Sequence, residues 1–553
     1  MQIDRRQLML AGAAMATIPA PANARAGTDL PAPPLAPGVI DRLAAEIERC
    51  RQLFGVLGLS VAIVRNGKPI YLAGHGVRQH GANAKVDADT LFQIGSTSKA
   101  FCAAGAGLLV DQGKIAWNDP VKKHLPGFTM PDRWLTENLT IKDALTHRTG
   151  YVGFWSSATA VIDLEECLSR IKFETPLGRF RDSFVYNNVM YGVVQAVIEH
   201  VSGRSWFDFV AECIFEPLGM TRTRPTPLAY WPREYVTGTF LGTVDVRDLH
   251  YRHALDGNVA MPHIYRGDGT IGVLPWQSYD NLAAAGSIVS SARDMAQWLA
   301  MHLAKGRYND REILKSDTID DMHKRQNFAL PDPPGFDRGQ SGYGMGWLTR
   351  SYRGRRLVEH TGGIEGFPAY IGFLPDDDIG MVILANGFTS YMRPLLPAVD
   401  SAGRQRDMGG MRKAISLLIY DILLGNPRSV DWAETLHAED ERDRAARLAY
   451  FAQVPAAMND ISGPQRSLSS FAGRYKDQTG RETNIEIVER QGTLELRFPG
   501  KGAYVARLRR RGNAIFFIDP VTTYHTADFL RFDLDEQGRA TGFNAFMTRF
   551  VPA

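Results

Sequence analysis

Cysteine, net charge and long hydrophobic runs are all scarce in this chain of 553 residues. Its four cysteines are too few for a disulfide framework and lack the Cys-x-x-Cys spacing of a structural zinc site, so we interpret them as core thiols. Lys and Arg total 63 against 60 for Asp and Glu, and the net charge of +3 provides no broad positive field for nucleic acid. No segment after the N-terminal region has the apolar length of a transmembrane helix.

The overall composition is that of a soluble globular protein, with 44% hydrophobic and 22% charged residues. At roughly 150 residues per domain, the length favours two to four domains. His250 and His253 lie near Asp248 but lack a third well-spaced ligand, so we expect no metal site there. No other pattern indicates a cofactor.

The N-terminus has the pattern of an export signal. Arg5 and Arg6 precede an apolar stretch of about a dozen residues, and small-x-small cleavage patterns follow at 22–24 and 24–26. The paired arginines resemble a twin-arginine signal, which predicts that residues 1–26 are removed and that the protein is periplasmic or secreted. The apolar stretch is too short for a stable membrane anchor, which needs roughly 20 residues. A buried N-terminal helix is the alternative.

The remainder divides into three regions. Residues 36–427 hold every reactive pattern described below, and residues 428–465 are polar with a helical period, as in a connecting helix and linker. In residues 466–553, short alternating strands recur about every ten residues between turns, which predicts a small all-β barrel.

The main region is predicted to be an α+β domain. Residues 39–54 have the apolar spacing of a helix, and residues 59–73 form a hairpin around Asn66-Gly67. A second set of strands spans 357–385, and the sequence between the two sets is mostly helical. We therefore expect an antiparallel sheet built from both ends of the domain, flanked by helices and carrying an inserted helical lobe.

Ser96 and Lys99 form the first candidate catalytic pair. They lie three residues apart, on one face of a predicted helix whose first turn follows Gly95. A serine hydroxyl needs a base to become a good nucleophile, and burial or a helix N-terminus can lower the pKa of a lysine enough for that role. A second Ser-x-x-Lys, Ser169 and Lys172, lies inside an amphipathic helix with no preceding glycine, and we interpret it as accidental.

Two further patterns accompany this pair. Tyr186 and Asn188 precede a strong helix at 189–201, so we expect them in a loop or extended segment, where two residues so spaced point the same way. A phenol beside an ammonium can share or lose its proton, and an amide can hold a lysine or a substrate amide. His360-Thr361-Gly362-Gly363 lies in a predicted strand, where paired glycines allow close approach of a substrate and an amide N–H can help hold an oxyanion.

Ser-x-x-Lys, Tyr-x-Asn and His-Thr-Gly, in this order, resemble the serine β-lactamase and penicillin-binding-protein superfamily, in the branch of class C β-lactamases, D-aminopeptidases and esterases. The resemblance covers roughly residues 38–427, while the C-terminal barrel is similar only in general to a β domain of some peptidase-like members. It is supported by four further stretches, at 145–150, 216–220, 285–294 and 343–347.

The resemblance implies the catalytic roles. Ser96 would be the acylated nucleophile and Lys99 its proton partner, while Tyr186 would protonate the leaving group and activate the water that removes the acyl group. Which of Lys99 and Tyr186 is the base in acylation stays open. The N–H groups of Ser96 and Gly363 would form the oxyanion hole.

The resemblance also implies the substrate contacts. Asn188 would hold Lys99 or the substrate amide, and His360, Thr361 and Gly362 would line the strand side of the pocket. Most β-lactamases and transpeptidases of this fold carry Lys at the position of His360, and histidine is mostly neutral at pH 7. A substrate carboxylate is therefore less favoured than an amide, a peptide amine end or an ester.

These inferences predict an exported serine hydrolase that needs no cofactor and acts on a small molecule or a peptide, either an amide bond of a D-residue-containing peptide or a carboxylic ester. Two alternatives remain open. One is β-lactamase or D-alanyl-D-alanine carboxypeptidase activity, and the other is a non-catalytic penicillin-binding-type binder or sensor.

Overall fold

The computed structural model describes residues 35–553 except for the stretches 152–162, 239–249, 266–270, 329–334, 388–409, 427–429, 443–444, 446–465, 478–483, 499–503, 511–513, 519–528 and 546–547 and the single positions 175, 338, 340 and 365. The predicted signal peptide, residues 1–26, lies outside the described residues. Within the described part of the chain, no helix combines the length and the apolar character needed to cross a membrane.

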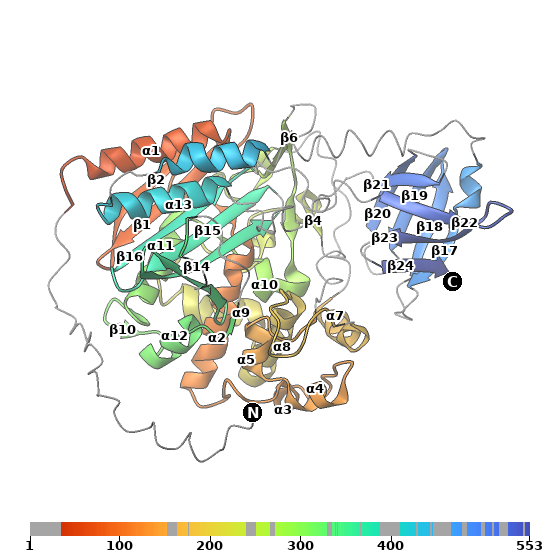
Figure 1. Cartoon of the computed structure of the whole chain (residues 1–553), viewed down its shortest axis with the longest axis horizontal. Helices are drawn as coiled ribbons and strands as arrows, with labels where there is room; N and C mark the ends of the chain where they lie inside the picture. The colour runs from red at the N-terminus through yellow and green to blue at the C-terminus, as the bar shows by residue number, and fades with distance from the viewer. Residues whose placement is uncertain are drawn as a thin grey trace, which may run out of the picture. The chain divides into compact units, whose positions relative to one another are not determined.

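An eight-stranded antiparallel sheet forms the centre of the main domain, in the order β11-β12-β13-β14-β15-β16-β1-β2 (Figure 1). The N-terminal hairpin lies beside strands from the far end of the domain, since Leu59 of β1 pairs with Ala385 of β16. The predicted α+β fold with a sheet assembled from both ends is therefore confirmed. The strands are β1 (Gly58–Arg65), β2 (Lys68–Gly76), β11 (Asn327–Phe328), β12 (Gly342–Tyr343), β13 (Leu348–Tyr352), β14 (Arg355–Ile364), β15 (Phe367–Leu374) and β16 (Ile379–Ala385).

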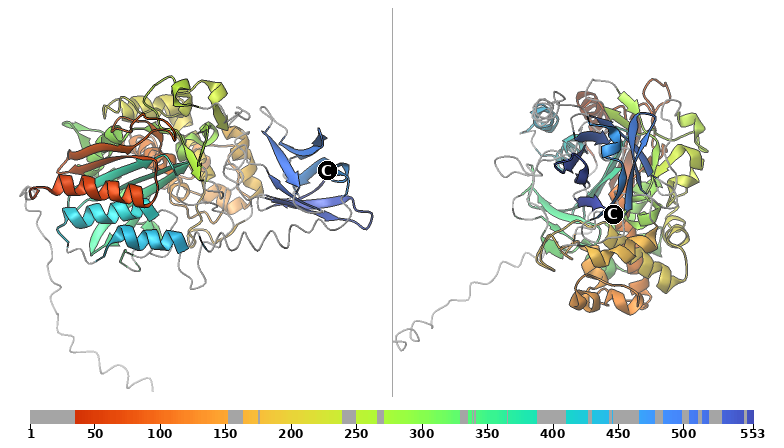
Figure 2. Two further views of the ribbon diagram at one scale, coloured as in Figure 1. Left: turned by 90° about the horizontal axis from the view of Figure 1, so that it is seen from above. Right: turned by 90° about the vertical axis from the view of Figure 1, so that its right-hand side faces the viewer.

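Helices cover both faces of this sheet. Alternate residues of a strand point to opposite faces, and in β1 Val61 and Ile63 face one apolar cluster while Ala62 and Val64 face another. The first cluster includes α1 (Val39–Leu53) and α13 (Gly410–Leu423), which lie side by side (Figures 1 and 2). The second includes α2 (Ser98–Asp111), α8 (Val189–Ser202) and α11 (Ala292–Leu303).

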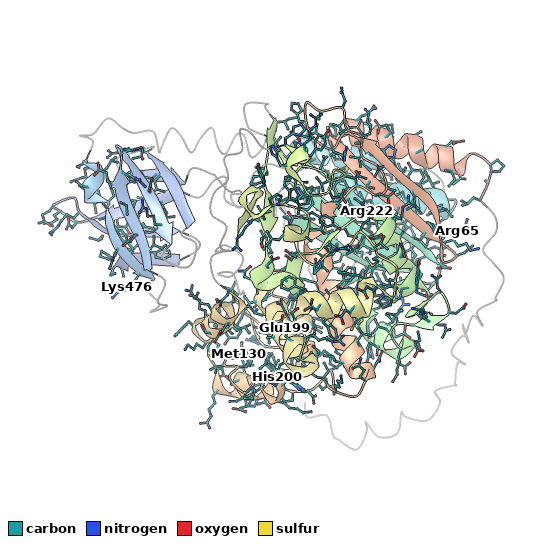
Figure 3. The ribbon with its side chains drawn as sticks, turned by 180° about the vertical axis from the view of Figure 1, so that it is seen from behind. Arg65, Met130, Glu199, His200, Arg222 and Lys476 are labelled. Carbon is teal, nitrogen blue, oxygen red and sulfur yellow. The ribbon has the colours of Figure 1, made fainter. Side chains whose placement is uncertain are left out.

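The segment between β2 and β11 contains the inserted helical lobe. Its central helix, α8, is buried along most of its length, and Glu199 near its end accepts a hydrogen bond from the backbone N–H of Trp206, 2.9 Å away. Figure 3 shows Glu199 and the neighbouring exposed His200 on this helix. The other helices are α3 (Val121–His124), α4 (Arg133–Asn138), α5 (Ile141–Leu145), α7 (Leu164–Arg170), α9 (Trp206–Val210), α10 (Ala283–Gly286) and α12 (Ser316–His323).

Short strands complete the domain between β2 and β11. Of these, β3 pairs with β8 and ends two residues before Gly95, so it leads into the candidate nucleophile. These strands are β3 (Phe92–Gln93), β4 (Val236–Gly238), β5 (His263–Tyr265), β6 (Ile271–Val273), β7 (Trp276–Ser278), β8 (Val289–Ser290), β9 (Arg307–Tyr308) and β10 (Arg311–Glu312).

Residues 432–442 are helical, in the region predicted as a connecting helix and linker. Ala433 and Leu436 are buried in the cluster that contains α1 and α13. Asp431 forms an ion pair with Arg49 of α1 at 2.8 Å. The first part of this region therefore packs onto the main domain instead of running free of it.

The C-terminal strands form a closed antiparallel barrel, as predicted, because β17 pairs with β24 as well as with β18. Its core is rich in phenylalanine: Phe471, Phe516 and Phe532 contact one another, and Phe543 contacts Phe532. The strands are β17 (Gly473–Asp477), β18 (Asn484–Arg490), β19 (Thr493–Phe498), β20 (Tyr504–Arg510), β21 (Ile515–Ile518), β22 (Phe529–Leu534), β23 (Ala540–Ala545) and β24 (Thr548–Pro552).

Two histidines form a buried pair in the core of the main domain. The Nδ1 atom of His302 in α11 lies 3.0 Å from Nε2 of His323 in α12, and the His302 ring contacts Trp298 and Trp347. Burial lowers the pKa of His302 well below its usual value and that of His323 to about 3. Both rings are therefore neutral at pH 7, and one donates a hydrogen bond to the other.

Acid should destabilise the main domain through this pair. The unfolded chain binds protons at these histidines below about pH 6.5, whereas the folded state stays neutral down to about pH 3, so stability is lost as the pH falls through that range. We expect the unfolding free energy of His323→Gln to decrease less steeply than that of the wild type, by up to about 1.4 kcal/mol per pH unit. Urea titrations followed by tryptophan fluorescence measure this slope.

The exposed His200 provides the matched control for this experiment. His200→Gln should keep the wild-type slope. Equal slopes for His323→Gln and the wild type would contradict the prediction.

Candidate active site

The candidate nucleophile lies in a tight turn that leads into α2. Gly95–Thr97 form a 3-10 turn, and Gly95 adopts φ +55°, a left-handed conformation that a side chain would disfavour. Lys99 follows in the first turn of α2, and its Nζ lies 3.1 Å from the Oγ of Ser96. Ser96 is half-buried, whereas its neighbours Gly95 and Thr97 are buried. The structure thus brings Ser96 and Lys99 together.

Lys99 is fully buried, and its surroundings favour the neutral amine. Its ammonium donates a second hydrogen bond, of 2.8 Å, to the carbonyl of Ala285 in α10. Burial lowers the pKa of Lys99 from 10.5 to about 7. A substantial fraction of the side chain is then an unprotonated amine at neutral pH, which can accept the proton of a serine hydroxyl.

Tyr186 lies in the loop before α8 and beside the lysine. Its ring centroid is 4.9 Å from Nζ of Lys99, and 38% of the residue is exposed. The structure therefore places the phenol at an accessible surface next to the Ser96–Lys99 pair.

Asn188 lies at the end of the loop that carries Tyr186, and α8 begins at Val189, as predicted. Asn188 is the N-cap of this helix, and its φ of −72° and ψ of −33° are helical. Among the described residues its Oδ1 is buried and has no hydrogen-bond partner. This oxygen therefore forms no hydrogen bond to Lys99.

Strand β14 forms the opposite wall of the site. β13 pairs with β14 only as far as Glu359, and in the described structure the segment 360–364 pairs only with β15. The turn of residues 95–97, which carries Ser96 and is called the nucleophile turn below, packs against this open edge. A Cβ at Gly362 would lie 2.0 Å from the carbonyl oxygen of Ile94, and a Cβ at Gly95 would lie 2.7 Å from the N of Gly363. Only glycine at both positions permits this contact.

The peptide N–H of Gly363 faces the site. Gly363 lies opposite Pro368, which has no N–H. Residues opposite each other in an antiparallel pair alternate between hydrogen-bonded and non-hydrogen-bonded pairs, and proline fits only the second kind. The N–H of Gly363 therefore points away from β15, towards the turn that carries Ser96.

The two other predicted strand residues differ in exposure. Thr361 is exposed, whereas only 3% of His360 is exposed and both of its ring nitrogens have protein partners. Nδ1 lies 2.7 Å from the carbonyl oxygen of Thr361, so it carries the proton, and Nε2 accepts from the hydroxyl of Tyr343 at 2.9 Å. Burial, with a smaller effect of Lys99, lowers the pKa of His360 to about 3. The ring is neutral, as expected, and lies beneath the pocket surface.

His147 and Tyr343 are site residues whose positions the sequence motifs did not predict. The ring of His147 packs on Tyr186 with a centroid separation of 4.1 Å, and its Nδ1 accepts the backbone N–H of Asn187 at 3.0 Å. The ring of Tyr343 also packs on His147, with a centroid separation of 4.7 Å. Both residues lie in stretches that support the family resemblance, but contact with Tyr186 could be known only from the folded chain.

Other sequence candidates have ordinary structural roles. Ser169 donates to the carbonyl of Glu166 at 2.9 Å, in agreement with an accidental second motif. All four cysteines are free thiols. Burial raises the pKa of Cys102, one turn after Lys99, so this thiol is unreactive. The described residues contain no group of three or more His, Cys, Asp or Glu side chains able to hold a metal.

The sheet, the helical lobe and the serine–lysine–tyrosine cluster together define a protein of the serine β-lactamase and penicillin-binding-protein type. Residues 43–403 match the family model described as Beta-lactamase, and the chain belongs to this family of hydrolases.

Among curated relatives, the unguisins hydrolase ungD' of Aspergillus campestris is 29% identical over 459 residues, which are 79% of this chain and 76% of the relative. Protein flp of Staphylococcus aureus is 24% identical over 360 residues, 64% of each chain.

Solved structures show the same fold. The octameric penicillin-binding protein homologue from Pyrococcus abyssi aligns with a TM-score of 0.56 and 21% identity over 93% of this chain and 99% of its own. The D-amino acid amidase from Ochrobactrum anthropi aligns with a TM-score of 0.52 and 20% identity over 69% of this chain and 99% of its own.

The contact between the nucleophile turn and β14 can be tested with Gly362→Ala. The added Cβ would meet the carbonyl oxygen of Ile94 and force the strand away from Ser96, so we expect hydrolysis to fall by about a hundredfold or more. Gly127→Ala is the control, because a Cβ there meets nothing within 4 Å. Steady-state rates and melting temperatures of both variants are measured. Unchanged rates for Gly362→Ala would contradict the close contact between Gly362 and the carbonyl of Ile94.

Proposed function

We propose that this protein is a serine hydrolase that forms an acyl-enzyme on Ser96 and cleaves the amide bond of a D-residue-containing peptide or a carboxylic ester. The observation that supports this proposal most directly is a fully buried lysine, Lys99, with a pKa of about 7, whose Nζ lies 3.1 Å from the Oγ of Ser96. Relatives named as a hydrolase and an amidase support the reaction class.

In the acylation step, Oγ of Ser96 attacks the substrate carbonyl carbon and its proton passes to the neutral amine of Lys99. The electron pair of the carbonyl moves to its oxygen, which the N–H groups of Ser96 and Gly363 stabilise as an oxyanion. We assign Lys99 as the base in this step because its Nζ is the atom in hydrogen-bond contact with Ser96. The tetrahedral intermediate then collapses, and the departing nitrogen or oxygen takes a proton from Tyr186.

Deacylation repeats the chemistry with water. Tyr186, next to Lys99 and exposed to solvent, takes a proton from a water molecule that attacks the acyl carbonyl. The Ser96 oxygen leaves and regains its proton from Lys99, which returns the site to its starting state.

The substrate class follows from the charge at β14. His360 is neutral and buried, so this position supplies no fixed cation for a substrate carboxylate. A substrate that presents an amide or an ester, or a peptide amine end, fits this wall better than a β-lactam carboxylate or a D-alanyl-D-alanine terminus.

Acylation of Ser96 can be detected by intact mass. A serine-directed phosphonate should add one group to the wild type and to Ser169→Ala, the control in the second Ser-x-x-Lys, and none to Ser96→Ala. Hydrolysis of a D-aminoacyl anilide, a nitrophenyl ester and a chromogenic cephalosporin is then compared. Turnover of the first two with little of the third supports the proposal. No adduct on the folded wild type would exclude it, and an adduct with no turnover would favour a binder or sensor.

The buried lysine should control the pH dependence of acylation. The amine is active when unprotonated, so the acylation rate should rise with pH to a plateau with an apparent pKa of about 7. Lys99→Met should lower the rate by about a thousandfold or more, whereas Lys172→Met, its control, keeps the wild-type profile. Single-turnover kinetics with a nitrophenyl ester measure both. A flat profile between pH 6 and pH 9 would exclude Lys99 as the base.

A further inference from the structure

Arg412 is a buried cation that contacts the backbone of the active-site strand. It lies in the first turn of α13, which packs on the sheet face covered by α1, and 6% of the residue is exposed. Its Nη1 donates hydrogen bonds to the carbonyl of Gly362 in β14, at 2.5 Å, and to that of Ala369 in β15, at 2.8 Å. These two residues lie directly opposite each other in the sheet.

The carbonyl of Gly362 belongs to the same peptide group as the N–H of Gly363. Resonance couples the two ends of a peptide group, so a positive charge at the carbonyl oxygen draws electron density from the nitrogen. The N–H of Gly363 then becomes a stronger hydrogen-bond donor. This N–H points away from β15, towards the turn that carries Ser96, because Gly363 lies opposite Pro368.

Strand pairing alone does not require this arginine. Gly362 and Ala369 already form part of the continuous register between β14 and β15. Burial of a guanidinium is costly unless it is well hydrogen-bonded, and arginine keeps its charge at all relevant pH values. The charge-assisted bonds also fix the plane of the Gly362–Gly363 peptide, at a segment where two successive glycines would otherwise allow it to rotate.

We propose that Arg412 is a positioning residue for catalysis. It holds and polarises the Gly362–Gly363 peptide from the far face of the sheet, so that the N–H of Gly363 is oriented and strengthened for the oxyanion that forms when Ser96 attacks. This inference rests on the proposed function, since it assigns a role in the same acylation step. Arg412 itself does not touch the substrate.

A role in the oxyanion hole predicts a specific kinetic pattern. The oxyanion exists in the transition state and not in the bound substrate, so Arg412→Met should lower the acylation rate by about tenfold to a hundredfold and change KM by less than about twofold. A boronate inhibitor that mimics the tetrahedral intermediate should bind more weakly by a similar factor. Arg412→Lys keeps the charge and should recover part of the loss.

The infrared spectrum separates this role from a structural one. The carbonyl stretch of the acyl group on Ser96 should move to higher frequency in Arg412→Met, because a weaker hydrogen bond polarises the carbonyl less. Lys413→Met is the matched control: Lys413 is also buried, in the same turn of α13, and lies over the ring of Phe336. It should leave the acylation rate and the carbonyl frequency unchanged.

The experiment uses the full chain and distinguishes the two proposals. If the wild type forms no adduct on Ser96, both are overturned. If the wild type is acylated and Arg412→Met is acylated at the same rate with the same carbonyl frequency, only the role of Arg412 is overturned. A slower rate with a lower melting temperature and no frequency shift also overturns it. Should Arg412→Met fail to fold, the same measurements on Arg412→Lys decide.

Discussion

The close contact between the nucleophile turn and β14 is the constraint on which the site depends. Gly95 adopts a left-handed conformation and Gly362 lies under the carbonyl of Ile94, so two backbone segments approach without side chains between them. This contact sets the distance from Ser96 to the N–H of Gly363. It also requires β14 to be held from its other side, where β15 pairs with it and Arg412 reaches it. The reactive groups thus depend on the sheet as a rigid support.

Burial supplies the second requirement, a lysine whose pKa is lowered to about 7, so that a substantial fraction of it is neutral at neutral pH. Lys99 lies among apolar helices. Its burial lowers the free energy of unfolding, because in the unfolded chain the lysine would be charged and solvated at pH 7. The same low-polarity surroundings keep His147 and His360 neutral, and the positive charge of Lys99 acts in the same direction on both rings. Tyr186 therefore packs on an uncharged His147 ring.

The fold class and the main motifs could be predicted because they depend on local patterns. The three-residue spacing of Ser96 and Lys99 on a helix, and the Asn66-Gly67 hairpin, are fixed by short-range geometry. The loop position of Asn188 before a helix that begins at Val189 could be predicted as well, but its helical dihedrals as the N-cap of α8 could not. His147, Tyr343 and Arg412 could not be assigned, because each acts through a neighbour that is distant in sequence.

The pairing of β1 with β16 also governs when the site can exist during synthesis. Leu59 and Ala385 must meet before the sheet is complete, and contacts so distant in sequence form late in folding. A growing chain that has emerged as far as α2 already carries Ser96 and Lys99, yet it lacks both β14, which forms the opposite wall of the candidate site, and the closed core that buries the lysine. The candidate site is therefore complete only after residues 355–385 have been made and have joined the sheet.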